Sequence, residues 1–163
     1  MGEHNQLTGN NYGLGGVNHR ALRQMFGNEA LNFIRLVIGN TTKSAVKYDA
    51  FDFTIDGTTY EQSSATDAAL TVLAYYGDSQ IQAVSKTCFY LITVNSGGTV
   101  NTTKGQDGET TKLPGIADTE CLIGIIKIET NSSTTFKIGA TDFDAAGITD
   151  TFYDYTHAPL TAP

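Results

Sequence analysis

The stretch that decides the fold is residues 121–155, which read CLIGIIKIETNSSTTFKIGATDFDAAGITDTFYDY. It opens with an apolar run, Leu122–Ile128, whose many β-branched residues are typical of a strand buried on both faces. Asn131–Ser133 is a turn cluster, and residues 134–138 after it alternate with the period of a half-buried strand. Together these features predict a β-hairpin at the centre of a sheet.

Strand patterns also occur earlier in the chain. Asp56–Gly57 is a strong signal for a two-residue hairpin turn, with residues 51–55 before it and 58–61 after it as strands. Apolar residues at 46 and 48 have the opposite phase to those at 51, 53 and 55, which predicts a bulge near Asp49–Ala50.

The strand predicted over residues 82–94 points Phe89 and Leu91 to one face and Tyr90, Ile92 and Val94 to the other. Asn95–Gly98 then turns the chain into a threonine-rich edge strand, residues 99–103. Residues 63–77 allow two interpretations, a short helix capped by Thr66 or Asp67, or a loop that contains a strand.

Six or seven short strands separated by turns favour an antiparallel β-sandwich or small barrel over an α/β fold. We expect an N-terminal extended arm and short helix in addition. The predicted division is an arm and docking segment over residues 1–43, a β domain over 44–157 and an extended tail over 158–163.

The N-terminal part is rich in Asn and Gly up to Gly16 and then becomes helix-like. Asn18 can cap a first helix, and Asn28 can cap a second one over Glu29–Ile38, ended by Gly39. The apolar stripe of this second helix would cover its own sheet or a neighbouring subunit. Residues 33–38 could instead form a strand.

Charge is divided unevenly along the chain, whose formal net charge is −7. Up to Lys43 there are four basic and two acidic residues, and after it six basic and fifteen acidic ones. Every arginine lies at or before Arg35. Because arginine favours interfaces and scattered acids favour solvent, we expect the arm to contact a partner that is not nucleic acid.

Motifs for catalysis are missing from the sequence, so we expect a protein that is not an enzyme and needs no cofactor. Cys88 and Cys121 are expected as buried, reduced thiols, with a disulfide as the alternative. No apolar run reaches the length of a membrane span. The only metal candidate is a weak calcium site at Asp142, Asp144 and Asp150, and aspartates in turns usually bond their own backbone instead.

Several phrases of this chain resemble small structural proteins of tailed bacteriophages. They are FDFTIDGTTYEQSSATD, CFYLITVNSGGTV, LPGIADTECLIGIIKI and FKIGATDFDAAGITDTFYDY, so the resemblance covers about Ala45 to Tyr155. Members of this group are described as virion or head-decoration proteins, which implies a location on the capsid surface after synthesis in the bacterial cytoplasm.

The resemblance implies a decoration or cement protein that binds the outside of a tailed-phage capsid and stabilises it through many copies. The expected partners are the major capsid protein and further copies of the chain, with a trimer plausible, and neither nucleic acid nor membrane. The alternative is a low-copy head-fibre or tail-tip module that binds a host-surface glycan. The expected docking residues are Arg20, Arg23, Arg35, Phe26 and Phe33.

Overall fold

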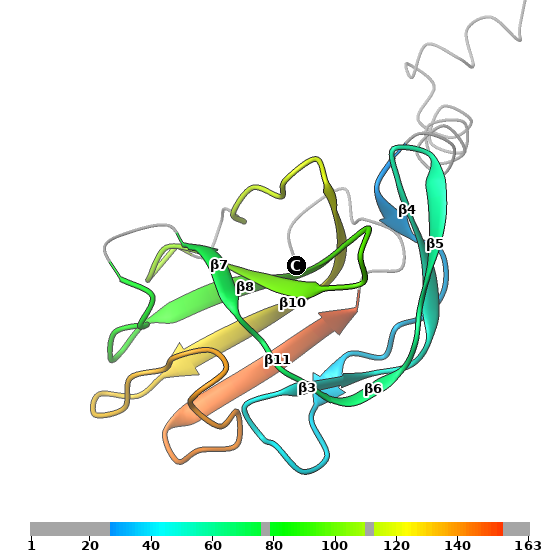
Figure 1. The fold of residues 1–163 in the computed structure, drawn as a ribbon. Coiled ribbons are helices and arrows are strands. Elements are labelled where there is room, and N and C mark those ends of the chain that lie inside the picture. The colour runs from blue at the N-terminus through cyan, green and yellow to red at the C-terminus, as the bar shows by residue number, and fades with distance from the viewer. Residues whose placement is uncertain (1–26, 76–78, 110–112, 155–163) are drawn as a thin grey trace, which may run out of the picture.

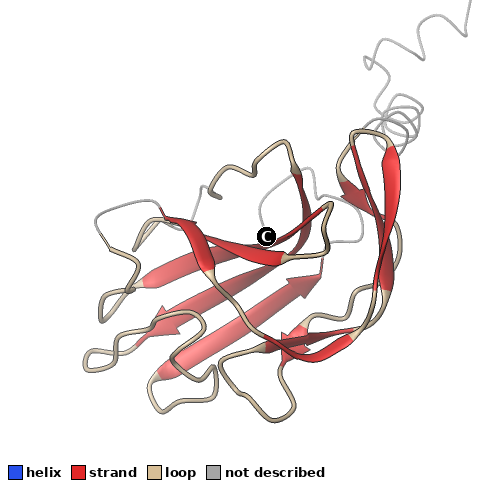
Figure 2. Cartoon of the chain, viewed as in Figure 1, coloured by secondary structure: helices blue, strands red, loops and turns tan. Residues whose placement is uncertain are grey.

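The computed structural model describes residues 27–75, 79–109 and 113–154, and these residues form strands and loops without a helix (Figures 1 and 2). The strands fall into three sheets. The five-stranded sheet has the order β11 (Ile148–Asp154), β10 (Glu120–Thr130), β8 (Thr87–Asn95), β9 (Val100–Lys104), β7 (Val72–Tyr75). One three-stranded sheet has the order β1 (Glu29–Ala30), β4 (Phe51–Ile55), β5 (Thr58–Gln62). The other has the order β2 (Val37–Ile38), β3 (Val46–Tyr48), β6 (Ala65–Ala68). The prediction of a mainly β fold is confirmed.

Strands β8 and β10 form the centre of the large sheet and are buried on both faces. They pair antiparallel over most of their length, and β10 also pairs with β11. Tyr90 and Ile92 of β8 face the main core, whereas Phe89 and Leu91 face a smaller cluster on the other side. The predicted two-sided burial of β10 is therefore confirmed, and so is the predicted phase of β8.

The main core lies between the five-stranded sheet and the two smaller sheets, which bend around one side of it (Figure 1). Aromatic rings run through it in contact, from Tyr90 to Phe136, Phe143 and Phe152. Such ring pairs add to the stability that burial of the apolar surface provides.

The predicted central hairpin is wrong in its second strand. Asn131 does make the expected turn, since its side-chain oxygen accepts hydrogen bonds from the backbone of Ser133 and Thr134. Residues 134–138 then make only an isolated bridge between Phe136 and Gln82. The place beside β10 belongs to β11, which forms a longer ladder, and Phe136 and Ile138 fill the core from a loop instead.

Two further strand predictions are also corrected. The chain between β3 and β4 does not bulge within one strand, because Asp49–Ala50 carries it from one small sheet to the other. The threonine-rich strand β9 is not an edge, because β7 pairs with it in parallel on its outer side. The parallel pairing had no signal in the local sequence.

The Asp56–Gly57 turn is confirmed, since β4 and β5 pair directly and both turn residues have positive φ, 50° and 75°. This is the geometry of the primed turns that suit two-residue hairpins. For residues 63–77 the sequence allowed a short helix or a loop that contains a strand. The structure has no helix there and forms the strands β6 and β7. The predicted first helix after Asn18 and the tail over 158–163 lie outside the described residues.

The predicted helix over Glu29–Ile38 is wrong, because the segment forms β1, an extended connection and β2. Asn28 does not cap a helix: its side chain bonds the backbone of Asp118, Glu120 and Asp56. Buried and exposed side chains alternate along 33–37 with a period of two, which is the strand alternative that the sequence had left open. Strands β1 and β2 pair with β4 and β3, so residues 29–38 contribute to both small sheets.

Candidate docking surface

The segment from Phe33 to Val37, which runs from the connection after β1 into β2, presents three side chains to solvent. Phe33 is 76% exposed and Val37 46%, and between them the Arg35 side chain is 77% exposed. We call these three residues the outer row. Their neighbours Ile34 and Leu36 are fully buried in the core, so the same short segment both anchors itself and displays the outer row.

Hydrogen bonds hold this segment to the body at several points. The Leu31 amide donates to the Asp52 carbonyl at 2.8 Å, and the Ile34 carbonyl accepts from the Asp49 amide at 2.8 Å. The Leu36 amide donates to a carboxylate oxygen of Asp154 at 2.6 Å. The outer row therefore stands on a backbone that is fixed before any partner arrives, which lowers the entropic cost of binding.

Arg35 has an unusual backbone conformation for a residue with a side chain. Its φ of 54° lies in the left-handed region, which costs a non-glycine residue about 1 kcal/mol or more. Its guanidinium nitrogen lies 3.3 Å from an Asp49 carboxylate oxygen, and both side chains are well exposed. An exposed ion pair of this kind contributes little stability, so a partner can recruit the guanidinium at small cost.

An aromatic ring, an arginine and an aliphatic side chain in one row form the combination that recurs at protein interfaces. Arginine and aromatic residues are enriched among the few contacts that carry most binding energy. A single exposed apolar residue has no such meaning, but Phe33 and Val37 are both exposed on one short segment that hydrogen bonds hold to the body. The outer row is therefore the best candidate for a docking surface in the described body.

The five predicted docking residues divide into two groups. Phe33 and Arg35 come together in the outer row, although a strand period and not a helical stripe places them there. Arg20, Arg23 and Phe26 lie outside the described residues. Val37 was predicted only as a member of the apolar stripe that would cover its own sheet or a neighbouring subunit. The signal for its exposure is the period-two spacing of 33, 35 and 37.

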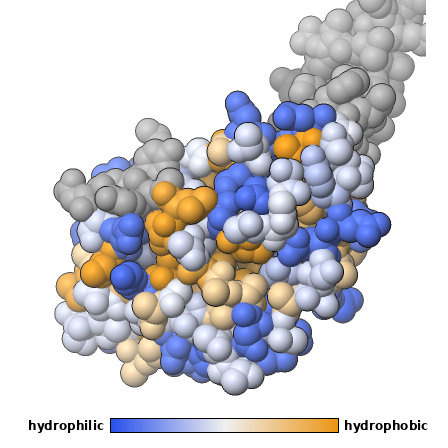
Figure 3. Space-filling view, in the orientation of Figure 1, coloured by the Kyte–Doolittle hydropathy of each residue, from blue (hydrophilic) through white to orange (hydrophobic). Residues whose placement is uncertain are grey.

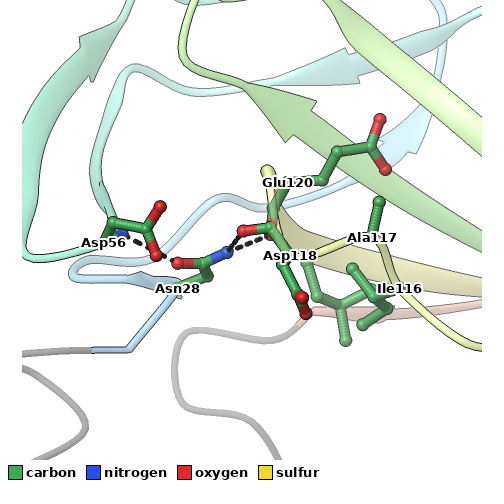
Figure 4. Close-up of a pocket in the computed structure, with 7 residues that line it drawn as sticks. Asn28, Asp56, Ile116, Ala117, Asp118 and Glu120 are labelled. Carbon is green, nitrogen blue, oxygen red and sulfur yellow. Dashed lines mark hydrogen bonds between the residues drawn. The ribbon is translucent and has the colours of Figure 1, made fainter.

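A second feature is a pocket of about 390 Å³ beside Asn28 (Figure 4). Its lining combines one amide with apolar and acidic residues, namely Asn28, Asp56, Ile116, Ala117, Asp118, Glu120 and Leu122. The Glu120 carboxylate points away from Asn28 (Figure 4) and accepts hydrogen bonds from Thr93 and Asn101 at 2.8 and 2.6 Å. The Asp56 and Asp118 carboxylates, by contrast, are exposed and form no ion pair with a described residue.

The space-filling view shows an apolar patch over β7 (Figure 3), where Leu73 is largely exposed. Strand β7 ends the five-stranded sheet, so its outer edge has no paired strand among the described residues. No helix in the described ranges is long and apolar enough to span a membrane.

The weak calcium candidate gains no support. Within residues 27–75, 79–109 and 113–154, no group of three or more His, Cys, Asp or Glu side chains is placed to hold a metal ion. Asp142 and Asp144 are exposed, and Asp150 is half-buried on β11. Burial and the negative charge of Asp144 raise the pKa of Asp150, and the hydrogen bond from its own backbone amide lowers it in part.

Both cysteines are buried and free, as predicted. Burial raises the pKa of each thiol to about 12, so neither forms a thiolate near neutral pH. Near Cys88 the buried ammonium of Lys104 pairs with Asp107. The Lys104 side chain is 2% exposed and that of Asp107, in the loop after β9, is 22% exposed, so the buried cation has a partner within the described body.

The comparisons with known proteins give no relative: no family model, no curated protein and no solved structure matches this chain.

Proposed function

We propose that this protein is a virion structural protein that binds the outside of a tailed-phage capsid and stabilises it as a decoration or cement protein. The outer row is the observation that carries the proposal. It offers a partner an aromatic ring, an aliphatic side chain and an arginine on a preformed backbone. The resemblance of residues 45–155 to phage structural proteins supports the choice of partner.

The distribution of charge supports binding through the N-terminal part of the chain. The 120 residues after Lys43 carry fifteen acids against six lysines, and the arm carries the arginines. The acidic body keeps the protein in solvent and away from DNA, while the basic side faces the shell. Arg20, Arg23 and Phe26 are the proposed contacts of the arm, beside Phe33 and Arg35 in the outer row.

For the architecture, we propose a β-sandwich that is antiparallel except for the parallel pair β7 and β9. The five-stranded sheet would form one layer and the two three-stranded sheets the other, around one shared core. A sandwich gives a binding protein rigid faces, so the docking segment keeps its shape when many copies bind.

The proposed function is tested by binding to purified phage heads that lack this protein. Phe33→Ser with Arg35→Ser should weaken co-sedimentation of the full chain by about 30-fold or more, since a pair of central contacts contributes about 2 kcal/mol or more. The matched control is Ile81→Ser with Lys137→Ser, which removes an exposed apolar residue and an exposed cation elsewhere on the body. Equal binding by both double variants would contradict the docking role of the outer row.

The copy number per virion tests the class of protein independently. Quantitative mass spectrometry against the major capsid protein should find hundreds of copies. A handful of copies would favour the head-fibre or tail-tip alternative, and none would contradict the virion assignment.

A further inference from the structure

The pocket beside Asn28 has the chemistry to receive an apolar side chain together with a cation. Ile116, which is 40% exposed, and the half-buried Leu122 provide apolar surface. The exposed carboxylates of Asp56 and Asp118 form no ion pair with a described residue. A pocket of about 390 Å³ has room for an aromatic ring. An occupant that combines an apolar group with a positive charge therefore matches its lining.

The outer row offers this combination of groups. Phe33 is largely exposed, and so is Arg35, which carries the only guanidinium among the described residues. The two residues are two positions apart, so their Cα atoms lie at most about 7 Å from each other and one site can contact both side chains. The ion pair from Arg35 to Asp49 is exposed and costs little to share, since a guanidinium has five donors.

The outer row does not fill the pocket of its own chain. Phe33 is not part of the lining and remains in solvent, and the buried side chains of Ile34 and Leu36 hold the segment in place. Two complementary surfaces on one molecule that do not meet within it can meet between copies. Such a heterologous contact joins the outer row of one copy to the pocket of the next.

We propose that, in the free protein, the outer row of one copy docks into the pocket beside Asn28 of a second copy. Phe33 packs on the apolar wall, and Arg35 pairs with the two carboxylates. The net charge of −7 makes copies repel one another in general, whereas this contact brings opposite charges together. Only a few side chains take part, far fewer than in a stable interface, so we expect a Kd of about 0.1–1 mM.

The consequence for the shell rests on the proposed function. A copy whose outer row lies in a neighbour's pocket cannot use the same side chains on a capsid, so self-association and capsid binding compete. By mass action, a capsid site with a lower Kd displaces the second copy. The pocket therefore covers the outer row in concentrated free protein and releases it to the shell.

Sedimentation velocity of the full chain, without phage heads, tests the contact. The weight-average sedimentation coefficient should rise between about 10 µM and 1 mM protein, and added salt should reduce the rise because it screens the ion pair. Phe33→Ser with Arg35→Ser should abolish the rise, and Ile116→Ser with Asp118→Asn should do the same. A wild-type chain that stays monomeric up to about 1 mM would overturn the proposal.

The matched control is Leu73→Ser with Asp142→Asn, which changes an exposed apolar residue and an exposed carboxylate outside the pocket. This control should associate as the wild type does. If it loses association as fully as the pocket variant, the pocket assignment is wrong.

A mixture of the two defective variants separates this contact from a symmetric one. The outer-row variant keeps an intact pocket and the pocket variant keeps an intact outer row. The mixture should therefore form pairs although neither variant associates alone. A mixture that stays monomeric would overturn the proposal, because the two surfaces would then not meet.

Binding to phage heads is measured separately, so the two proposals can fail independently. The pocket variant keeps its outer row and should co-sediment with heads at least as well as the wild type. A chain that binds heads but never self-associates contradicts only this inference. A chain that self-associates but does not bind heads contradicts only the proposed function.

Discussion

Strand β10 and the segment over residues 29–38 are both apolar, contact the same core and differ in what surrounds them. Strand β10 has β8 on one side and β11 on the other, and apolar clusters cover both its faces. The segment pairs over only two residues at each end, so one face of its middle stays in solvent. Similar apolar residues are therefore buried in β10 and partly exposed in the segment. The number of neighbouring strands, and not the composition, determines whether such a side chain is exposed.

The largest effect should come from trimming β10. Ile126→Ala should lower the free energy of unfolding by about 2–5 kcal/mol, because it leaves a cavity in the main core. Val37→Ala in the outer row should cost less than about 1 kcal/mol, since Val37 is half in solvent. Chemical denaturation measures the free energy of unfolding of both variants. Equal losses would contradict the difference between β10 and the segment.

A smaller effect should come from the point where the two regions touch. A Cβ on Gly124 of β10 would lie 2.6 Å from Leu36 Cδ2 and 3.1 Å from the Tyr153 carbonyl oxygen. Gly124→Ala should therefore cost about 1–3 kcal/mol through overpacking.

Leu36→Ala should relieve part of that cost, because it removes the methyl group that the new Cβ meets. The loss in the double variant should be less than the sum of the two single losses. Additive losses would show that the segment does not press on β10.

The next prediction concerns the pH dependence of stability at Asp67, which binds the chain just after the segment over residues 29–38. The backbone amides of Thr42 and Thr41 donate to Asp67 and lower its pKa below the usual 3.8. Because the folded pKa is the lower one, this stabilisation is complete above about pH 3.8 and is lost as the pH falls through the folded value. At pH 7 the wild type should have a higher Tm than Asp67→Asn in thermal unfolding. This difference in Tm should disappear in acid. A gap that persists well below the folded pKa would mean that the charge is not the cause.

The smallest effect on stability should come from Arg35→Gly. Glycine adopts the left-handed conformation at φ 54° without strain, and the substitution removes only an exposed ion pair. The free energy of unfolding should therefore rise, by no more than about 1 kcal/mol. Binding to phage heads should fall all the same. Loss of fold together with loss of binding would show that Arg35 is structural.

The sequence predicted those features that depend on near neighbours. The Asp56–Gly57 turn, the phase of Phe89 and Tyr90, and the two-sided burial of β10 all follow from local patterns. The partner of β10 did not follow, because residues 134–138 and 148–154 both have strand patterns and only the whole fold selects between them.

The docking surface shows the same division. Phe33 and Arg35 were predicted from composition, but through a helix that does not form. Alternation of Phe33, Ile34, Arg35 and Leu36 fits both periods over so few residues, and the pairing of the segment with β3 and β4 selects the strand. The pocket had no sequence signal, because Asn28, Asp56 and Asp118 come from distant parts of the chain.

The hydrogen bond from Leu36 to Asp154 spans 118 residues and has a consequence for folding in time. At about 5–20 residues per second, a ribosome needs roughly 6–24 s to synthesise that interval. Until then Ile34 and Leu36 have no complete core to enter, and long-range pairing of this kind also folds slowly. The outer row can therefore take its full shape only after β11 is made. Under the proposed function, an unfinished chain should then not compete with finished copies for the shell.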